Sequence, residues 1–172
     1  SITDGQIFLQ QDLFNAGFRP AIDTGLSVSR VGSSAQIKAM KQVSGSLKLE
    51  LAQFAEMQAF AQFGSDLDAA TKATLDHGEK VREVLKQAQY SPRSVEEQVI
   101  SLFALKYGFT KAIPVAKVSQ FVSELYEEMK FNHADMIEDI RIQKAISEEL
   151  TKQLKEVMGE FVEKFLKVNK EG

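Results

Sequence analysis

Cysteine is absent from all 172 residues of the chain. Without cysteine the chain forms no disulfide, no thiolate zinc site and no cysteine nucleophile, so its fold is held by packing and hydrogen bonds alone. Long apolar runs are also lacking, because none approaches the roughly 18 to 20 residues that a membrane-spanning helix needs. No stretch is typical of a signal peptide. We therefore expect no direct membrane insertion, so that a membrane would be reached only through partners.

Neither sign of charge dominates. The chain has 21 basic and 24 acidic residues, a formal net charge of −3, and no dense cluster of Lys and Arg. Binding to a phosphate backbone depends on such a cluster, and nucleic acid is therefore not an expected partner. The 44% of hydrophobic residues is instead typical of a globular domain with a real core.

The amino-terminal part differs in pattern from the remainder. Residues 1–34 contain short apolar runs broken by Pro20 and by several glycines, which is typical of strands and loops at the edge of an α/β domain. Residues 1–5 run straight into the strand-like residues 6–9, which favours the interpretation that the chain is cut inside a domain. From Ser34 onward the apolar residues recur at steps of three and four, the period of amphipathic helices.

Two helical stripes follow this change of period. The first runs from Leu47 to Ala61 and is closed by Gly64. The second covers residues 75–85, with Ser65 as a possible cap, and we expect an interruption at Gly78.

Three further helices are expected in the second half of the chain. Ser94 and Glu97 form a capping-box pattern for a helix that ends at Gly108. Another apolar stripe covers residues 118–129, and a last one begins near Ser147. Because each stripe needs a partner to bury against, the pattern predicts a mainly α fold built as a compact helical bundle.

Candidate chemistry is sparse. His77 and His133 lie in polar surroundings without metal-ligand spacing and are interpreted as surface residues. Asp66, Asp68 and Asp76 lack the spacing of a calcium loop and are interpreted as helix caps or solvated positions, so no metal site is predicted. The Met and Phe stripes predict core packing. No nucleophile elbow, phosphate-binding glycine loop or Walker-type lysine occurs, and the chain alone is not predicted to catalyse a reaction.

Arg30 remains as the sharpest candidate. It lies between small and β-branched residues in the stretch Leu26–Ser33, just ahead of the first long helix. One interpretation is an ordinary surface or salt-bridged arginine. The other is a guanidinium held on a short loop that presents a bidentate positive fork to a phosphate on another chain. The spacing alone does not decide between them.

The loop around Arg30 belongs to a series of motifs that resembles the alpha subunit of F-type ATP synthases. The motifs occur in the order and at the separations of that family, and the resemblance covers residues 1 to about 108. They are SITDGQIFL (1–9), DLF (12–14), GFRPA (17–21), SVSRVG (27–32), AMKQV (39–43), LELAQF (49–54), AQFGSDLDAAT (61–71), LKQAQYSP (85–92) and EEQ (96–98).

The resemblance implies a domain organisation. Residues 1–34 would be the end of the nucleotide-binding domain, a remnant of its α/β fold, and residues 35–172 would be the carboxyl-terminal helical bundle. The fold class expected is therefore mainly α, with the α/β remnant in front. The amino-terminal barrel and the phosphate loop of the family are missing, so this part alone would be inactive.

The resemblance also implies site residues. The arginine matching Arg30 acts as an arginine finger in trans at the catalytic site of the beta subunit, and the residues matching Ser1 and Gly5 lie at the same interface. The non-catalytic nucleotide site of the family places adenine against residues that match Phe14, Arg19, Pro20, Gln87 and Gln89. For the two glutamines, an ordinary position at a helix end is the alternative. Phe18 departs from the family, which usually has an aliphatic residue there.

Ligands and partners follow from the same resemblance. The intact subunit would bind ATP or ADP with Mg²⁺, none of it tightly held by this chain alone. The expected partners are beta subunits in an alternating ring of three alpha and three beta chains, the central-stalk gamma subunit and the peripheral stalk. The complex would make ATP with a proton gradient, as a peripheral assembly on the cytoplasmic face of a bacterial plasma membrane, or on an organelle inner or thylakoid membrane.

Two other interpretations stay open at this point. Periodicity alone predicts only a helical interaction module with no connection to nucleotides. The catalytic beta subunit and its vacuolar-type relatives are a further possibility. The arginine loop favours alpha over beta, and the acidic Asp-Glu-Leu-Ser-Glu-Glu-Asp motif of beta is missing from the sequence.

Overall fold

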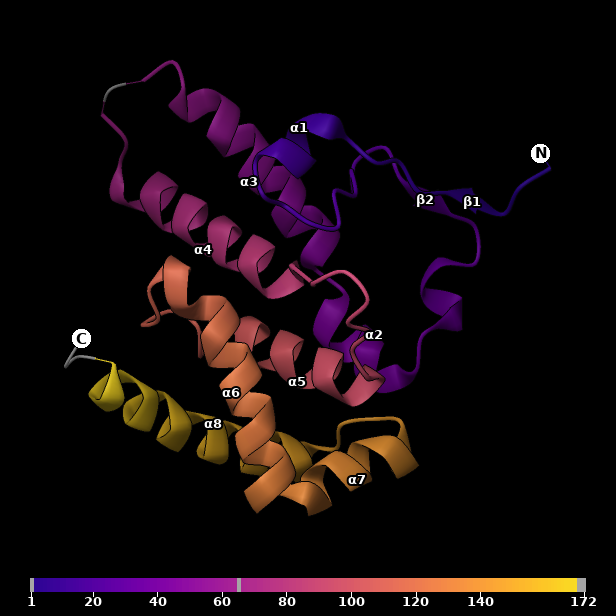
Figure 1. The fold of residues 1–172 in the computed structure, drawn as a ribbon, viewed down its shortest axis with the longest axis vertical. Coiled ribbons are helices and arrows are strands. Elements are labelled where there is room, and N and C mark those ends of the chain that lie inside the picture. The colour runs from indigo at the N-terminus through magenta and orange to yellow at the C-terminus, as the bar shows by residue number, and fades with distance from the viewer. Residues whose placement is uncertain (1, 65, 170–172) are drawn as a thin grey trace. The chain divides into compact units, whose positions relative to one another are not determined.

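A computed structural model describes residues 2–64 and 66–169 (Figure 1). The chain divides into two compact units, which we call the first unit (residues 1–36 and 45–92) and the second unit (residues 37–44 and 93–172). Helices dominate both units, and the described strands form a single two-stranded sheet. The prediction of a mainly α fold is confirmed.

The first unit joins a loop-rich segment to a pair of long helices. The segment pairs β1 with β2 in antiparallel register, Gly5 opposite Ser29 and Gln6 opposite Val28. Its short helix α1 was not predicted, because five residues are too few to show a helical period. The elements of this unit are β1 (Gly5–Gln6), α1 (Gln11–Asn15), β2 (Val28–Ser29), η1 (Gly32–Ala35), α3 (Leu47–Ala61) and α4 (Ala69–Leu85).

The predicted interruption at Gly78 is wrong, since α4 continues through this residue. Gly78 is buried against the ring of Phe54 on α3, and a Cβ built on it would lie 2.1 Å from Phe54 Cδ2. A glycine in a helix interior usually costs about 1 kcal/mol relative to alanine. Here it lets two helices approach closely, so the sequence signal of a helix break was a signal of packing.

Polar contacts complete this helix pair. The Asp68 carboxylate caps α4 by accepting the N–H of Thr71 at 2.7 Å, whereas Ser65 lies outside the described residues. His77 Nε2 lies 2.8 Å from Glu50 Oε2, linking α4 to α3. Partial burial tends to raise the pKa of Glu50, but hydrogen bonds from Ser46 and His77 and the His77 charge outweigh it and lower the pKa.

The second unit is built around α5, in which every residue from Val99 to Leu105 is buried. Helices α2, α6 and α7 contact α5, and Phe121 of α6 packs on Phe161 and Phe165 of α8 with ring centroids 5.6 and 5.2 Å apart. The elements are α2 (Lys38–Ser44), α5 (Val95–Lys106), η2 (Val115–Lys117), α6 (Val118–Asn132), α7 (Ala134–Gln143) and α8 (Glu148–Val168). Helices α2 and α7 were not predicted.

The predicted helix ends of this unit are confirmed. Ser94 Oγ accepts the N–H of Glu97 at 3.1 Å, and Ser147 Oγ accepts that of Leu150 at 3.0 Å. Gly108 ends α5 at φ 80°, and the N–H of Phe109 reaches back to the Ala104 carbonyl at 2.9 Å. Each cap uses local chemistry that is readable from the residue types.

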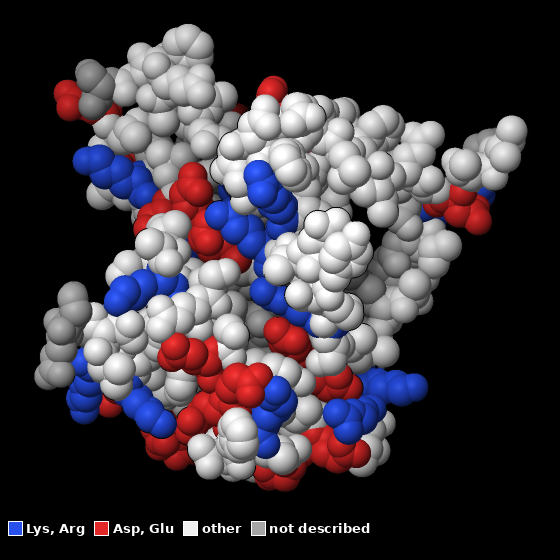
Figure 2. Space-filling model, in the orientation of Figure 1, with Lys and Arg blue, Asp and Glu red and all other residues white. Residues whose placement is uncertain are grey.

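The surface of the two units differs in charge on the face shown in Figure 2. Over α6, α7 and α8, basic and acidic side chains are interspersed. Around α1 the surface is largely uncharged, and several apolar side chains of the amino-terminal segment are exposed, namely Ile7, Leu9, Leu26 and Val28. In the part of the chain that the structure describes, none of the helices has the length and apolar character that crossing a membrane requires.

The contact at Gly78 generates a prediction about stability. Gly78→Ala places a methyl group against Phe54, and we expect the free energy of unfolding to fall by about 1 to 3 kcal/mol, as in other overpacked cores. Gly159→Ala in α8 is the matched control, because the nearest atom to its added Cβ is Phe109 Cε1 at 4.0 Å. There the change removes only the glycine penalty and should stabilise by about 0.5 to 1 kcal/mol. Denaturant unfolding measures both, and equal signs for the two variants would contradict the packing argument.

Candidate functional site

The hairpin of β1 and β2 presents Arg30. Arg30 directly follows β2, and its N–H donates to the Asp4 carbonyl at 2.7 Å. On the other side of the loop, Ser29 Oγ accepts the N–H of Gly32 at 2.9 Å. The backbone of Arg30 is thus fixed from both sides, by strand pairing and by a turn.

The Arg30 side chain lies at the surface. It is 70% exposed, and its Nη1 lies 3.8 Å from an Asp4 carboxylate oxygen that is itself 82% exposed. Exposed ion pairs of this kind contribute little, about 0 to 1 kcal/mol. The guanidinium can therefore exchange this contact for a stronger interaction, such as a bidentate pair of hydrogen bonds to a phosphate.

Gly5 supports the same loop from the opposite strand. A Cβ built on Gly5 would lie 2.6 Å from the Val28 carbonyl oxygen, so only glycine allows the strands to pair this closely. The structure thus brings Gly5 and Arg30 together, as members of one hairpin. Ser1, the third residue predicted for this interface, lies outside the described residues.

The residues predicted to bind adenine form a second group. The Arg19 guanidinium stacks on the Phe14 ring, with Cζ 3.9 Å from the ring centroid, and Arg19 Nε donates to the Phe14 carbonyl at 3.3 Å. Pro20 follows through a cis peptide bond. The N–H of Gln87, at the end of α4, donates to the Arg19 carbonyl at 3.0 Å. One main-chain hydrogen bond therefore joins segments that are far apart in the sequence.

The loop after α4 carries both glutamines. The Gln87 amide nitrogen donates to the Ser91 carbonyl at 2.9 Å, which closes the loop, and Gln89 lies exposed inside it. Phe14 is 46% exposed, and Arg19 and Pro20 are exposed beside it. A stacked guanidinium, a proline and amide groups offer flat apolar faces together with hydrogen-bonding edges, which suits a planar heterocycle.

Asp23 organises the segment between the two groups and was missed by the sequence reasoning. Its Oδ1 accepts the N–H groups of Gly25 and Leu26, both at 2.9 Å, and Oδ2 accepts from the Gln10 side chain at 3.3 Å. The hydrogen bond from Leu26 is the main reason that the pKa of Asp23 is lowered. The Asp-Thr-Gly triplet is typical of an Asx turn and could have indicated this role.

Phe18 and Arg82 were also missed as a pair. Phe18 is buried, and Arg82 Cζ of α4 lies 5.0 Å from its ring centroid. An aliphatic residue, which the family resemblance leads one to expect at position 18, could not make this cation–π contact. No pattern in the sequence links the two positions.

Within residues 2–64 and 66–169, no three His, Asp or Glu side chains converge as a metal site would require. His77 instead pairs with Glu50. The N–H of His133 donates to the Met129 carbonyl at 2.9 Å, at the junction of α6 and α7. The described part of the site therefore offers cationic and stacking chemistry.

Comparison with known protein families shows the class to which the chain belongs. Residues 36–161 match the model of the ATP synthase alpha/beta chain, C terminal domain, and the chain belongs to this family. It is 54% identical, over 98% of its length, to a protein of Rickettsia bellii named ATP synthase subunit alpha. It is 55% identical, over 96% of its length, to the protein of that name from Mycolicibacterium smegmatis.

These matches confirm the resemblance drawn from the sequence motifs. The chain spans only about a third of the length of these curated relatives, 33% and 30% respectively. The family model covers Gln87 and Gln89, whereas the Arg30 hairpin and Phe14 precede its first residue.

The close strand pairing at Gly5 leads to a second prediction. Gly5→Ala should separate β1 from β2 and release the Arg30 N–H from the Asp4 carbonyl, so that this amide exchanges with deuterium about tenfold faster or more. Hydrogen exchange followed by mass spectrometry or NMR measures this. Gly64→Ala is the control, since a Cβ on Gly64 meets no described atom within 4 Å. Unchanged exchange at Arg30 in Gly5→Ala would show that the pairing does not fix the loop.

Proposed function

We propose that this chain is part of the regulatory, non-catalytic alpha subunit of an F-type ATP synthase and supplies Arg30 in trans to a catalytic site on a beta subunit. The observation that carries the proposal is the presentation of Arg30, whose backbone is fixed on a glycine-dependent hairpin while its guanidinium is exposed. The relatives named ATP synthase subunit alpha support the identity of the complex.

The role proposed for Arg30 is electrostatic stabilisation of the transferring phosphoryl group. The joining of ADP and phosphate, and its reversal by water, spreads negative charge over the oxygens of the transferring phosphoryl group, and a positioned guanidinium stabilises that charge. The rigid backbone matters because the arginine must reach the phosphate without first ordering its own loop. The phosphate-binding loop of the catalytic site is proposed to lie on the beta subunit, and the nucleophile is an oxygen of ADP in synthesis or of water in hydrolysis, so this chain alone is proposed to be inactive.

The second group is proposed to hold the adenine of the subunit's own non-catalytic nucleotide. Arg19 stacked on Phe14, with Pro20 beside it, supplies the flat surface, and Gln87 and Gln89 supply hydrogen bonds to the base edge. Bound Mg²⁺ would supply charge neutralisation at the nucleotide phosphates. We assign no residue of this chain to the metal.

The assembly proposed around this chain is an alternating ring of three alpha and three beta subunits, with the gamma subunit as central stalk and a peripheral stalk outside. The complex makes ATP from ADP and phosphate with a proton gradient. It lies peripherally on a membrane, most simply the cytoplasmic face of a bacterial plasma membrane, given relatives in Rickettsia and Mycolicibacterium.

The arginine-finger role is tested by Arg30→Ala and Arg30→Lys in the assembled complex. Arginine fingers contribute roughly 10³-fold to 10⁵-fold to turnover, and lysine lacks the planar fork, so both variants should lose about 10³-fold in steady-state ATP hydrolysis while assembly persists. Arg141→Ala is the control, because Arg141 is exposed on α7 in the other unit, where it forms ion pairs with Glu96 and Glu138. Normal turnover in Arg30→Ala complexes would refute the role.

The non-catalytic nucleotide site is tested by Arg19→Ala. Loss of the stacked guanidinium should weaken nucleotide binding by about tenfold, the effect of removing roughly 1 to 2 kcal/mol of cation–π and stacking energy. Nucleotide retained by the purified complex, counted after gel filtration, measures this. Full retention in Arg19→Ala, with Arg141→Ala as reference, would exclude Arg19 from the site.

A further inference from the structure

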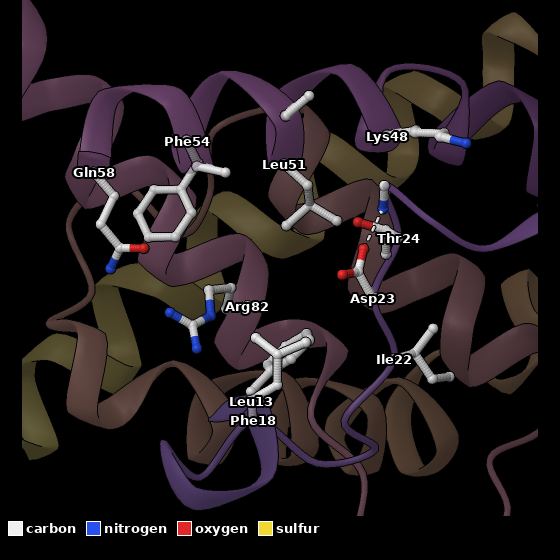
Figure 3. A pocket seen from close by; sticks show the side chains of 13 residues that line it. Leu13, Phe18, Ile22, Asp23, Thr24, Lys48, Leu51, Phe54, Gln58 and Arg82 are labelled. Atoms are coloured by element: carbon white, nitrogen blue, oxygen red, sulfur yellow. Dashed lines mark hydrogen bonds between the residues drawn. The ribbon is translucent and has the colours of Figure 1, made fainter. Parts of the chain in front are cut away.

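A pocket of about 250 Å³ lies inside the first unit, between the segment of residues 13–25 and helix α3. Figure 3 shows its lining. Its walls are mainly apolar, formed by Leu13 and Phe18 on one side and by Leu51 and Phe54 on the other. None of these side chains has a role in the function proposed above. The pocket is therefore considered as a separate binding site.

One end of the pocket is formed by Arg82, which lies between the rings of Phe54 and Phe18 (Figure 3). Its Cζ is 5.0 Å from the Phe18 centroid and 5.7 Å from the Phe54 centroid. The side chain is only 16% exposed, and its ion pair with Glu79 is long, at 3.9 Å. A guanidinium held against two apolar rings keeps N–H donors that this distant carboxylate does not engage in hydrogen bonds.

The lining of the pocket has two cations and one carboxylate, and the Glu79 carboxylate lies outside the lining, 3.9 Å from Arg82. The cations are Arg82 and the exposed Lys48, and the carboxylate is that of Asp23. Both Asp23 oxygens already accept hydrogen bonds, from Gly25 and Leu26 on one and from Gln10 on the other. The Asp23 carboxylate is thus occupied by hydrogen bonds within its own segment. Arg82 is the group at the apolar end of the pocket that can attract an anion.

We propose that this pocket binds a small apolar monocarboxylate, with its carboxylate on the Arg82 guanidinium and its hydrocarbon body between Leu13, Phe18, Leu51 and Phe54. A cavity of 150 Å³ holds benzene and drug-sized ligands need 300 Å³ or more, so the pocket fits a ligand of about ten non-hydrogen atoms. Octanoate has this size and is the probe for the experiment. The binding does not depend on the function proposed for Arg30 or Arg19.

The experiment titrates octanoate into the full-length subunit by calorimetry. One molecule should bind per chain, and Arg82→Gln should lower the affinity about tenfold or more, as expected for loss of a charged hydrogen bond. Lys72→Gln removes the same charge from an exposed position on α4 that does not line the pocket, and it should leave the affinity unchanged. Octan-1-ol, which lacks the charge, should bind more weakly than octanoate and should not distinguish Arg82→Gln from the parent.

A second variant tests the cavity without touching the charge. Ala55 lines the pocket from an exposed position on α3, and Ala55→Phe should fill the space and abolish octanoate binding while the circular dichroism spectrum stays native. Three outcomes would overturn the proposal: no saturable binding to the parent subunit, as when another segment of the longer polypeptide fills the pocket; equal binding of octanol; or unchanged affinity in Ala55→Phe.

Discussion

The contact between the Phe54 ring and Gly78 sets how closely α3 and α4 pack, and much of the first unit depends on it. Because α4 has no Cβ at this point, the ring can lie directly on the helix backbone. Phe54 in turn flanks Arg82, and Arg82 contacts Phe18. Through this series the packing of two helices positions the segment that carries Arg19 and Pro20.

The helices with long stripes or strong caps were predictable from the sequence. Ser94, Ser147 and Gly108 act through local backbone chemistry, which residue type and spacing reveal. Gly78 was misread because the same residue both breaks isolated helices and permits close packing, and only the partner decides between the two. Helices α1, α2 and α7 were missed since their short segments owe their conformation to tertiary contacts, such as the bonds between Gln42 and Ile146 that hold α2.

The candidate site divides in the same way. Family motifs indicated Arg30, Gly5 and the adenine group, but periodicity and composition left Arg30 between a surface role and a functional one. What the sequence could not provide was the geometry, because the pairing of Gly5 with Ser29 and the bond from Gln87 to Arg19 join residues that are distant in the chain. The pairs Phe18–Arg82 and Glu50–His77 were hidden for the same reason.

The bond between Gln87 and Arg19 is made entirely by the main chain. Any residue except proline can donate it, so the side chain at position 87 is free to change without separating the two segments. The Gln87 side chain makes a separate contact, because its amide nitrogen donates to the Ser91 carbonyl and closes the loop that carries Gln89. A substitution at position 87 would therefore open this loop and still leave the two distant segments joined through the main chain.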